Sequence, residues 1–243
     1  MGERFDRVYQ RTAWAALFLV FFVVILGAFV RLSDAGLGCP DWPGCYGHMG
    51  VPDEAHEIQR ANEAYPERPV ETHKAWKEMA HRYFGAALGM LILVLTIMAW
   101  IRHKRLRERE HKLMGFTLAW VIIQGLLGMW TVTLLVNPTV VTLHLAGGLL
   151  TLSLLWLLVL RQHHWFDKSA HIFQRFRRVT VIGLIILCIQ ILLGGWTSTN
   201  YAALACTDFP TCHGQWLPEM DMKEGFIPWR PLGVDYEFGV LDA

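Results

Sequence analysis

Two histidines and one acid lie within or beside long apolar stretches of this sequence, where an ionisable side chain is costly. They are Glu78, His81 and His144. An ionisable side chain at membrane depth costs several kcal/mol, so it is a functional candidate by default. Glu78 and His81 stand at i and i+3, on one face of a helix. Glu78 has no packing reason to be an acid, which points to proton transfer.

Glycines accompany both histidines. Gly85 follows His81 on the same helical face, and Gly148 follows His144 at i+4. Two histidines on neighbouring helices, with glycines that leave room for a planar ring, are what a haem requires. Two other interpretations stay open. The Gly85-x-x-x-Gly89 spacing is typical of a close helix crossing, and His144 alone is as well explained by a hydrogen bond between helices.

The cysteines form two pairs with the same spacing, Cys39 with Cys45 and Cys206 with Cys212. Each spacing permits a disulfide but does not prove one. A structural crosslink and an exchange-active pair both stay open, while a zinc site fits less well because Cys-x5-Cys is not a usual zinc spacing. Cys188, within an apolar stretch, is interpreted as a packing residue.

The composition places these residues in a membrane protein. The chain has 53% apolar and 18% charged residues and a mean hydropathy of +0.31, while a net charge of +1 gives no pointer to nucleic acid. About 20 apolar residues span the hydrocarbon, and Pro138 divides the longest charge-free gap. The sequence predicts an all-α, polytopic membrane bundle with transmembrane helices at 13–30, 79–101, 113–134, 139–160 and 179–197.

The basic residues predict the orientation. Segments 1–12, 102–112 and 161–178 hold 14 of the 22 Lys and Arg but only 5 Asp and Glu. Loops retained in the cytoplasm are enriched in Lys and Arg, so we expect a multi-pass inner (cytoplasmic) membrane protein with a cytoplasmic N-terminus. The Cys-bearing segments 31–77 and 198–243 then lie on the outer face, where disulfides persist.

An internal repeat predicts the domain organisation. Residues 26–47 align without gaps on residues 193–214, with nine of 22 positions identical. We predict an N-terminal four-helix half over 1–160, a cytoplasmic linker over 161–178 and the start of a second half over 179–243. Because the second half shows only its first helix, we expect a chain truncated from eight helices.

Four motifs together resemble a known family. They are Arg31-Leu-Ser-Asp-Ala-Gly-Leu-Gly-Cys-Pro-Asp-Trp-Pro-Gly-Cys45, Glu78-x-x-His81-Arg82, Gln124-Gly-Leu-Leu-Gly-Met-Trp-Thr-Val132 and His144-Leu-Ala-Gly-Gly148. The first two are quite specific, and the similarity covers most of the chain. They resemble the heme A synthase family of cytochrome oxidase assembly proteins.

This resemblance implies an oxidoreductase built from two four-helix halves. Its reaction converts the methyl group at ring position 8 of heme O to a formyl group, which gives heme A for the terminal oxidase. Carried over, His81 and His144 are axial to the substrate haem, Glu78 is the catalytic acid, and Cys39 and Cys45 form an outer-loop disulfide.

The resemblance also implies further partners. In the family a b-type haem is a cofactor held by a second His pair, and we expect the ligands of that haem to be missing from this chain. Heme O synthase is the expected donor of substrate, and the cytochrome oxidase assembly machinery and membrane lipid are the other expected partners.

Two other classes of protein compete with this interpretation. A membrane thiol-disulfide oxidoreductase uses outer Cys pairs, but it usually needs a low-pKa Cys-x-x-Cys and leaves Glu78 and His81 unexplained. A non-enzymatic b-type haem carrier or assembly factor shares both histidines, but it has no use for Glu78.

Overall fold

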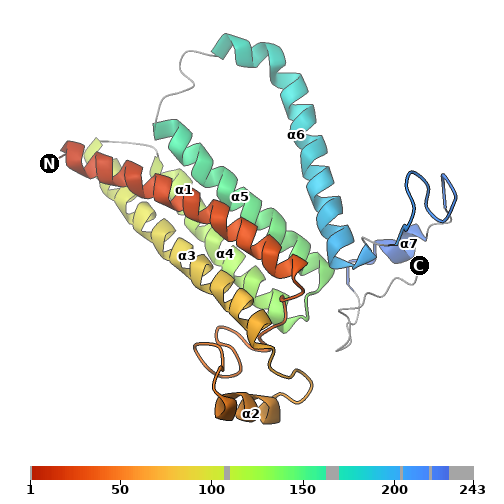
Figure 1. Ribbon diagram of the computed structural model, residues 1–243. Coiled ribbons are helices and arrows are strands. Elements are labelled where there is room, and N and C mark those ends of the chain that lie inside the picture. The colour runs from red at the N-terminus through yellow and green to blue at the C-terminus, as the bar shows by residue number, and fades with distance from the viewer. Residues whose placement is uncertain (1, 107–109, 163–169, 203–204, 219–220, 230–243) are drawn as a thin grey trace.

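The structure is a computed structural model that describes residues 2–106, 110–162, 170–202, 205–218 and 221–229. Within these ranges it is helical and contains no strand beyond isolated bridges. Its elements are α1 (Gly2–Leu32), α2 (Ala55–Ala64), α3 (Thr72–Leu106), α4 (Glu110–Thr133), α5 (Pro138–Gln162), α6 (Ala170–Thr199) and α7 (Met222–Gly225) (Figure 1). Five of these helices are long and apolar enough to cross a membrane. The predicted polytopic helical membrane bundle is confirmed.

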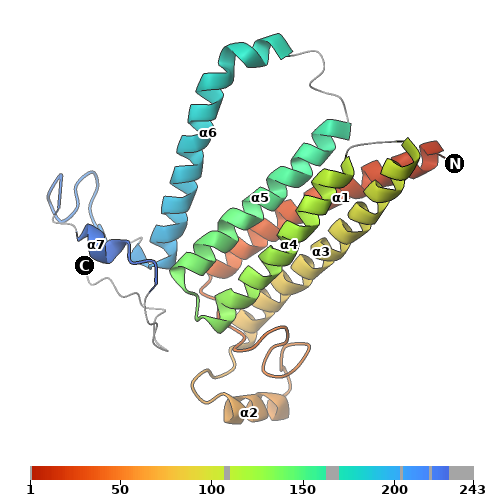
Figure 2. The same cartoon turned by 180° about the vertical axis from the view of Figure 1, so that it is seen from behind.

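Four of the long helices form a closed bundle. α1 packs against α3 and α5, and α4 packs against the same two helices, so α3 and α5 occupy opposite corners. The core between them is apolar and includes Val20, Ile92 and Leu155, all at most 1% exposed. α6 packs mainly against α5, and near its C-terminal end the carbonyl oxygen of Ser198 accepts a hydrogen bond from Arg31 of α1. The N-terminal end of α6 diverges from the bundle (Figures 1 and 2).

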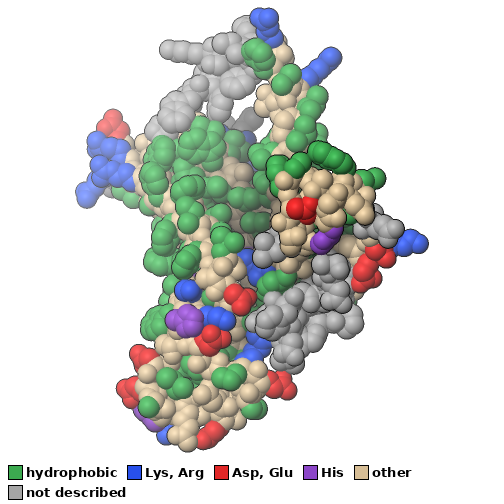
Figure 3. All heavy atoms as spheres, turned by 45° about the vertical axis from the view of Figure 1, so that its right-hand side comes forward, with side chains coloured by type: hydrophobic (Ala, Val, Ile, Leu, Met, Phe, Trp, Pro, Cys, Tyr) green, Lys and Arg blue, Asp and Glu red, His purple; other side chains and the backbone are tan. Residues whose placement is uncertain are grey.

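The outer surface of the bundle is apolar along its middle. Figure 3 shows hydrophobic side chains over the length of the helices and charged side chains gathered near the ends. Large side chains such as Phe18, Ile97 and Ile122 are more than half exposed. Because lipid tails are as apolar as these side chains, this exposure is expected of helices that cross a bilayer.

The helices extend beyond the predicted spans. α1 begins at Gly2, and α3 covers Thr72–Leu106, because the charge-free gaps mark only the part within the hydrocarbon. The charged flanks continue as helix and pair with each other: the guanidinium of Arg102 lies 3.2 Å from Asp6 and 3.9 Å from Glu110. These ion pairs join α1, α3 and α4 at one end of the bundle.

The opposite end carries the connection between α1 and α3, and we call it the loop end. Its first part, residues 33–48, is called the first loop, and α2 follows in the same connection (Figure 1). A small separate core fixes this connection to the start of α3, and it contains Cys39, Cys45, Tyr46, Val51, Ala61, Ala75 and Met79. The first loop is thus packed onto the helix that carries Glu78 and His81.

Candidate functional site

The two imidazoles predicted from the sequence face each other inside the bundle. His81 comes from α3 and His144 from α5, the two helices at opposite corners. Their ring centroids are 6.4 Å apart, and the ring planes make an angle of 81°. Both side chains are partly buried. Because α3 and α5 do not pack against each other, the two rings reach across the interior from opposite sides.

Glycines on the neighbouring helices make room for both rings. An ideal Cβ on Gly27 of α1 would lie 2.8 Å from Cε1 of His81, and one on Gly128 of α4 would lie 3.2 Å from Cε1 of His144. Contacts this short are rare for real Cβ atoms, so both rings depend on a residue without a side chain opposite them. α1 and α4 thus set the positions of rings that α3 and α5 carry.

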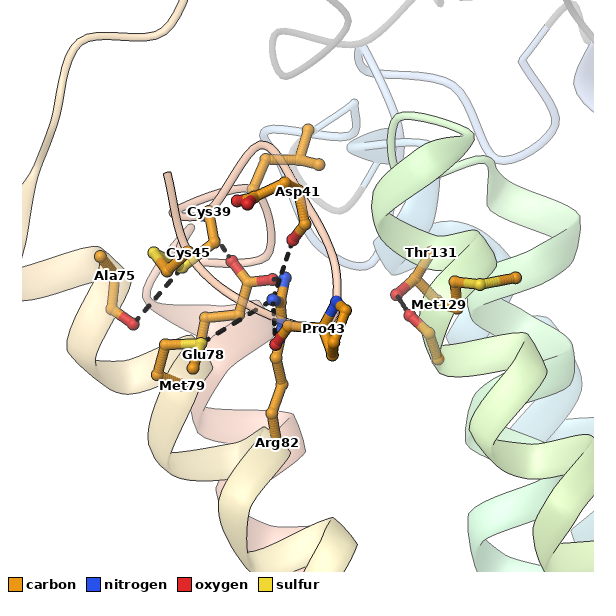
Figure 4. Close-up of polar contacts among 12 residues, drawn as sticks. Cys39, Asp41, Pro43, Cys45, Ala75, Glu78, Met79, Arg82, Met129 and Thr131 are labelled. Carbon is orange, nitrogen blue, oxygen red and sulfur yellow. Dashed lines mark hydrogen bonds and ion pairs between the residues drawn. A yellow bond between two sulfur atoms is a disulfide. The ribbon is translucent and has the colours of Figure 1, made fainter. Parts of the chain in front are cut away.

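Glu78 is buried at 4% exposure and holds the first loop against α3. Its Oε2 accepts a hydrogen bond of 2.9 Å from the backbone N–H of Cys39, and its Oε1 lies 2.5 Å from Nη2 of Arg82. Nη1 of Arg82 donates to the carbonyl oxygens of Asp41 at 2.9 Å and Gly44 at 2.5 Å. In Figure 4 both side chains rise from α3 toward the loop and its disulfide. Charge-assisted bonds of this kind are among the strong ones.

The first loop is closed by the Cys39–Cys45 disulfide, with a Cα–Cα distance of 4.8 Å. The carboxylate of Asp41 accepts from the backbone N–H groups of Tyr46 at 2.6 Å and Gly47 at 2.8 Å. Both cysteines have 0% exposure. Burial raises the pKa of the Tyr46 phenol to about 12, so this hydroxyl stays protonated near neutral pH.

Replacing Arg82 by Ala is expected to open the first disulfide to reductant. Hydrogen bonds to charged groups contribute about 1.5–3 kcal/mol each, so losing those of Arg82 raises the rate of reduction at least about tenfold. Maleimide labelling after timed exposure to dithiothreitol measures the rate. The Cys206–Cys212 disulfide of the same molecule is the internal control, and equal acceleration at both disulfides would contradict a role for Arg82 in holding the first loop.

A second loop, described at residues 200–202 and 205–215, repeats the first in three dimensions. Its disulfide, between Cys206 and Cys212, has the same Cα–Cα distance of 4.8 Å. Asp208 stands where the first loop has Asp41, and its carboxylate accepts from the backbone N–H groups of His213 at 2.7 Å and Gly214 at 3.0 Å. A hydrogen bond from the Thr211 hydroxyl, together with these two backbone bonds, lowers the pKa of Asp208. The internal repeat is therefore structural as well as sequential.

Comparisons with known proteins identify the family. A sequence model described as cytochrome oxidase assembly protein matches residues 10–233. The heme A synthase of Shewanella oneidensis is 44% identical over 236 residues, which are 96% of this chain and 70% of that protein. The chain belongs to the heme A synthase family. The heme A synthases of Halalkalibacterium halodurans and Alkalihalophilus pseudofirmus are each 29% identical to this chain. The alignments cover 84% and 89% of this chain and 63% and 66% of those two proteins. No solved structure matches the chain.

In this member of the heme A synthase family, the predicted site residues Glu78, His81 and His144 lie in the loop-end half of the bundle. Glu78 points to the first loop, while His81 and His144 point to each other. The two predicted cofactor-binding glycines differ. A Cβ on Gly85 would meet no atom within 4 Å, whereas one on Gly148 would lie 3.6 Å from Nε2 of Gln124. Gly85 thus borders open space, and Gly148 packs against α4.

Four residues that shape this site had no individual role in the sequence prediction, although three of them stand within its motifs: Gly27, Arg82, Gln124 and Gly128. Arg82 had a signal, because it stands at i+4 from Glu78, the spacing of helical ion pairs. Gln124 also had one, because it is an amide in the middle of an apolar span. The two glycines had none, because their importance depends on rings from other helices.

Proposed function

We propose that this chain is a heme A synthase that binds heme O between His81 and His144 and oxidises its ring-position 8 methyl group to a formyl group. The relatives of this chain are heme A synthases, which indicates the reaction. The facing rings of His81 and His144 indicate where heme O binds. This reaction makes the protein an oxidoreductase that serves cytochrome oxidase assembly.

The separation of the two imidazoles carries the proposal. Metal–nitrogen bonds of about 2 Å on each side of one ion place two ring centroids roughly 6 Å apart. The observed distance is 6.4 Å. This spacing supports His81 and His144 as the two residues that would hold one haem iron between them.

A further feature supports a haem between these rings. Gly85, one turn beyond His81 on α3, borders open space where a flat macrocycle can approach. The site is thus open to a planar ring on the α3 side.

Glu78 is the residue we assign to proton transfer. It lies one turn from His81 on α3, at the boundary between the imidazole pair and the first loop. Converting a methyl group to a formyl group with oxygen from water releases protons and electrons. The electrons go to an external electron acceptor, and the protons need an acceptor within the site. A buried carboxylate held by Cys39 and Arg82 provides one at a fixed position.

We assign the loop end to the outer face of the inner membrane, and the N-terminus to the cytoplasm, from the distribution of Lys and Arg. Both disulfides then lie on the oxidising side. Heme O synthase is the proposed donor of substrate. The family resemblance adds a b-type haem cofactor, to which we assign no residue of this chain.

The thiol-disulfide oxidoreductase alternative is disfavoured by burial. Cys39 and Cys45 are fully buried within the first loop, whereas an exchange-active thiol needs access for its partner.

The function is tested by producing the full chain in a bacterial strain that makes heme O and lacks its own heme A synthase. We expect heme A in the extracted haems, separated by chromatography, and heme O bound to the purified protein. A chain that is stably inserted in the membrane but binds no heme O would contradict the proposal.

Replacing Gly27 by Ala is expected to lower the affinity for heme O about tenfold or more. The new methyl group would lie 2.8 Å from Cε1 of His81 and displace the ring from its position opposite His144. Spectroscopic titration with heme O measures the effect. The control is Gly115→Ala on α4, where a Cβ meets no atom within 4 Å, and equal affinities of the two variants would contradict the expectation.

A further inference from the structure

Gln124 of α4 is the side chain that holds His144. Its Nε2 lies 3.1 Å from Nδ1 of the His144 ring and 2.7 Å from the backbone carbonyl oxygen of the same residue. Two contacts from one amide to one histidine fix the ring relative to its own backbone. They also tie the ring, which is carried by α5, to α4.

Two further residues of α4 help to hold the His144 ring in place. Trp120, Gln124 and Gly128 stand at i, i+4 and i+8, so they share one face. Nε1 of Trp120 donates a 3.1 Å hydrogen bond to the carbonyl oxygen of Gly147 on α5. A Cβ on Gly147 would overlap Oε1 of Gln124, so the amide fits only because residue 147 is glycine. Gly128 accommodates the Cε1 edge of the ring.

We propose that Gln124 is a positioning residue that fixes the orientation of the His144 ring for the substrate haem. The inference rests on the proposed function and deepens it, because it makes the two ligands unequal. His144 is held by a hydrogen bond at Nδ1, whereas Nδ1 of His81 has no partner among the described residues. Outer partners of this kind orient metal-binding histidines and set their basicity.

An amide suits this task in either tautomer of the ring. It carries both a donor and an acceptor, so it can serve Nδ1 with or without a proton. Oε1 of Gln124 is buried and has no hydrogen-bond partner among the described residues. A half-turn of the amide would offer Oε1 to a protonated Nδ1, the form that a histidine takes when a metal binds its other nitrogen. It would do so in exchange for the hydrogen bond from Nε2 to the carbonyl oxygen of His144.

The test compares three variants of the full chain in detergent: Gln124→Met, Gln124→Glu and Thr131→Val. Met has a similar size but cannot form the hydrogen bond, and Glu can only accept one. Thr131 is the matched control, because among the described residues its hydroxyl bonds the carbonyl oxygen of Gly128 on its own helix and no residue of another helix. Each protein is titrated with ferric heme O, and its low-spin fraction, reduction potential and melting temperature are measured.

We expect Gln124→Met to weaken heme O binding about 10- to 100-fold and to convert part of the low-spin haem to high-spin, at a melting temperature near that of the unchanged chain. Thr131→Val should stay within about twofold. If Gln124→Met fails to fold, Gln124→Glu tests the proposal in its place. This variant should keep low-spin haem and lower the reduction potential of the haem, because a carboxylate at Nδ1 makes His144 a more basic ligand.

If Gln124→Met folds and keeps the affinity and spin state of the unchanged chain, the positioning role of Gln124 is overturned. If Gln124→Met does not fold, an unchanged reduction potential in Gln124→Glu overturns it. Either result concerns only Gln124 and not the proposed function. The proposed function would still stand if His81→Ala and His144→Ala weakened binding. Absence of heme O binding by the unchanged chain would overturn both.

Discussion

Replacing Glu78 by Gln is expected to leave heme O bound and to lower heme A formation at least about 100-fold. A positioned general base contributes about 10²- to 10⁴-fold to the rate, and an amide of the same size cannot take up a proton. The Gln side chain retains an acceptor oxygen for the N–H of Cys39, so the first loop stays attached. Chromatography of the extracted haems gives the heme A yield, and the absorption spectrum gives bound haem.

The matched control is Glu71→Gln, at the residue just before α3. Glu71 pairs with Lys74 at 3.1 Å and is about half exposed, so its loss should change the heme A yield less than about twofold. Equal heme A yields from the unchanged chain and from Glu78→Gln would show that Glu78 does not transfer the proton. Undiminished electron transfer with no heme A from either protein would favour the haem carrier instead.

Replacing either imidazole is expected to cost most of the haem affinity. His81→Ala and His144→Ala should each weaken heme O binding at least about 100-fold, because even outer partners of metal ligands contribute about 10- to 100-fold. The remaining histidine can supply a single ligand. Titration of the purified variants with heme O, followed by absorption spectroscopy, measures the effect.

His73→Ala serves as the control for these variants. His73 lies on the same helix as His81, but its side chain is about two-thirds exposed, so its loss should leave the affinity unchanged. If His81→Ala and His144→Ala bound heme O as tightly as His73→Ala does, the haem would lie elsewhere in the protein.

Two features of the fold were predictable from the sequence: the membrane helices, from the distribution of charged residues, and the two loops, from the internal repeat. Charge-free gaps located all five membrane helices, because a bilayer penalises any charge within its hydrocarbon. Identical residues at a constant offset located both loops. The helix ends were not predictable, because helices continue into polar flanks at no cost. α2 was missed because Ala55–Ala64 is mostly polar and lacks an apolar stretch.

The i, i+3 spacing predicted that Glu78 and His81 share one face of a helix, and the sequence also paired His81 with His144 on a separate helix. It gave no role to Gln124, because the contact of Gln124 with His144 joins two helices. The task of Arg82 was hidden as well, because its acceptors include backbone carbonyl oxygens of Asp41 and Gly44. Every residue has a carbonyl oxygen, so no sequence pattern marks these two.

The electron paramagnetic resonance spectrum of ferric heme O bound to the full chain tests the central claim most directly. Two imidazoles on one iron give a low-spin spectrum, and we expect it from the unchanged chain and its loss in His81→Ala and in His144→Ala. A high-spin spectrum from the unchanged chain, or a low-spin spectrum that survives in both variants, would contradict the placement of heme O between His81 and His144.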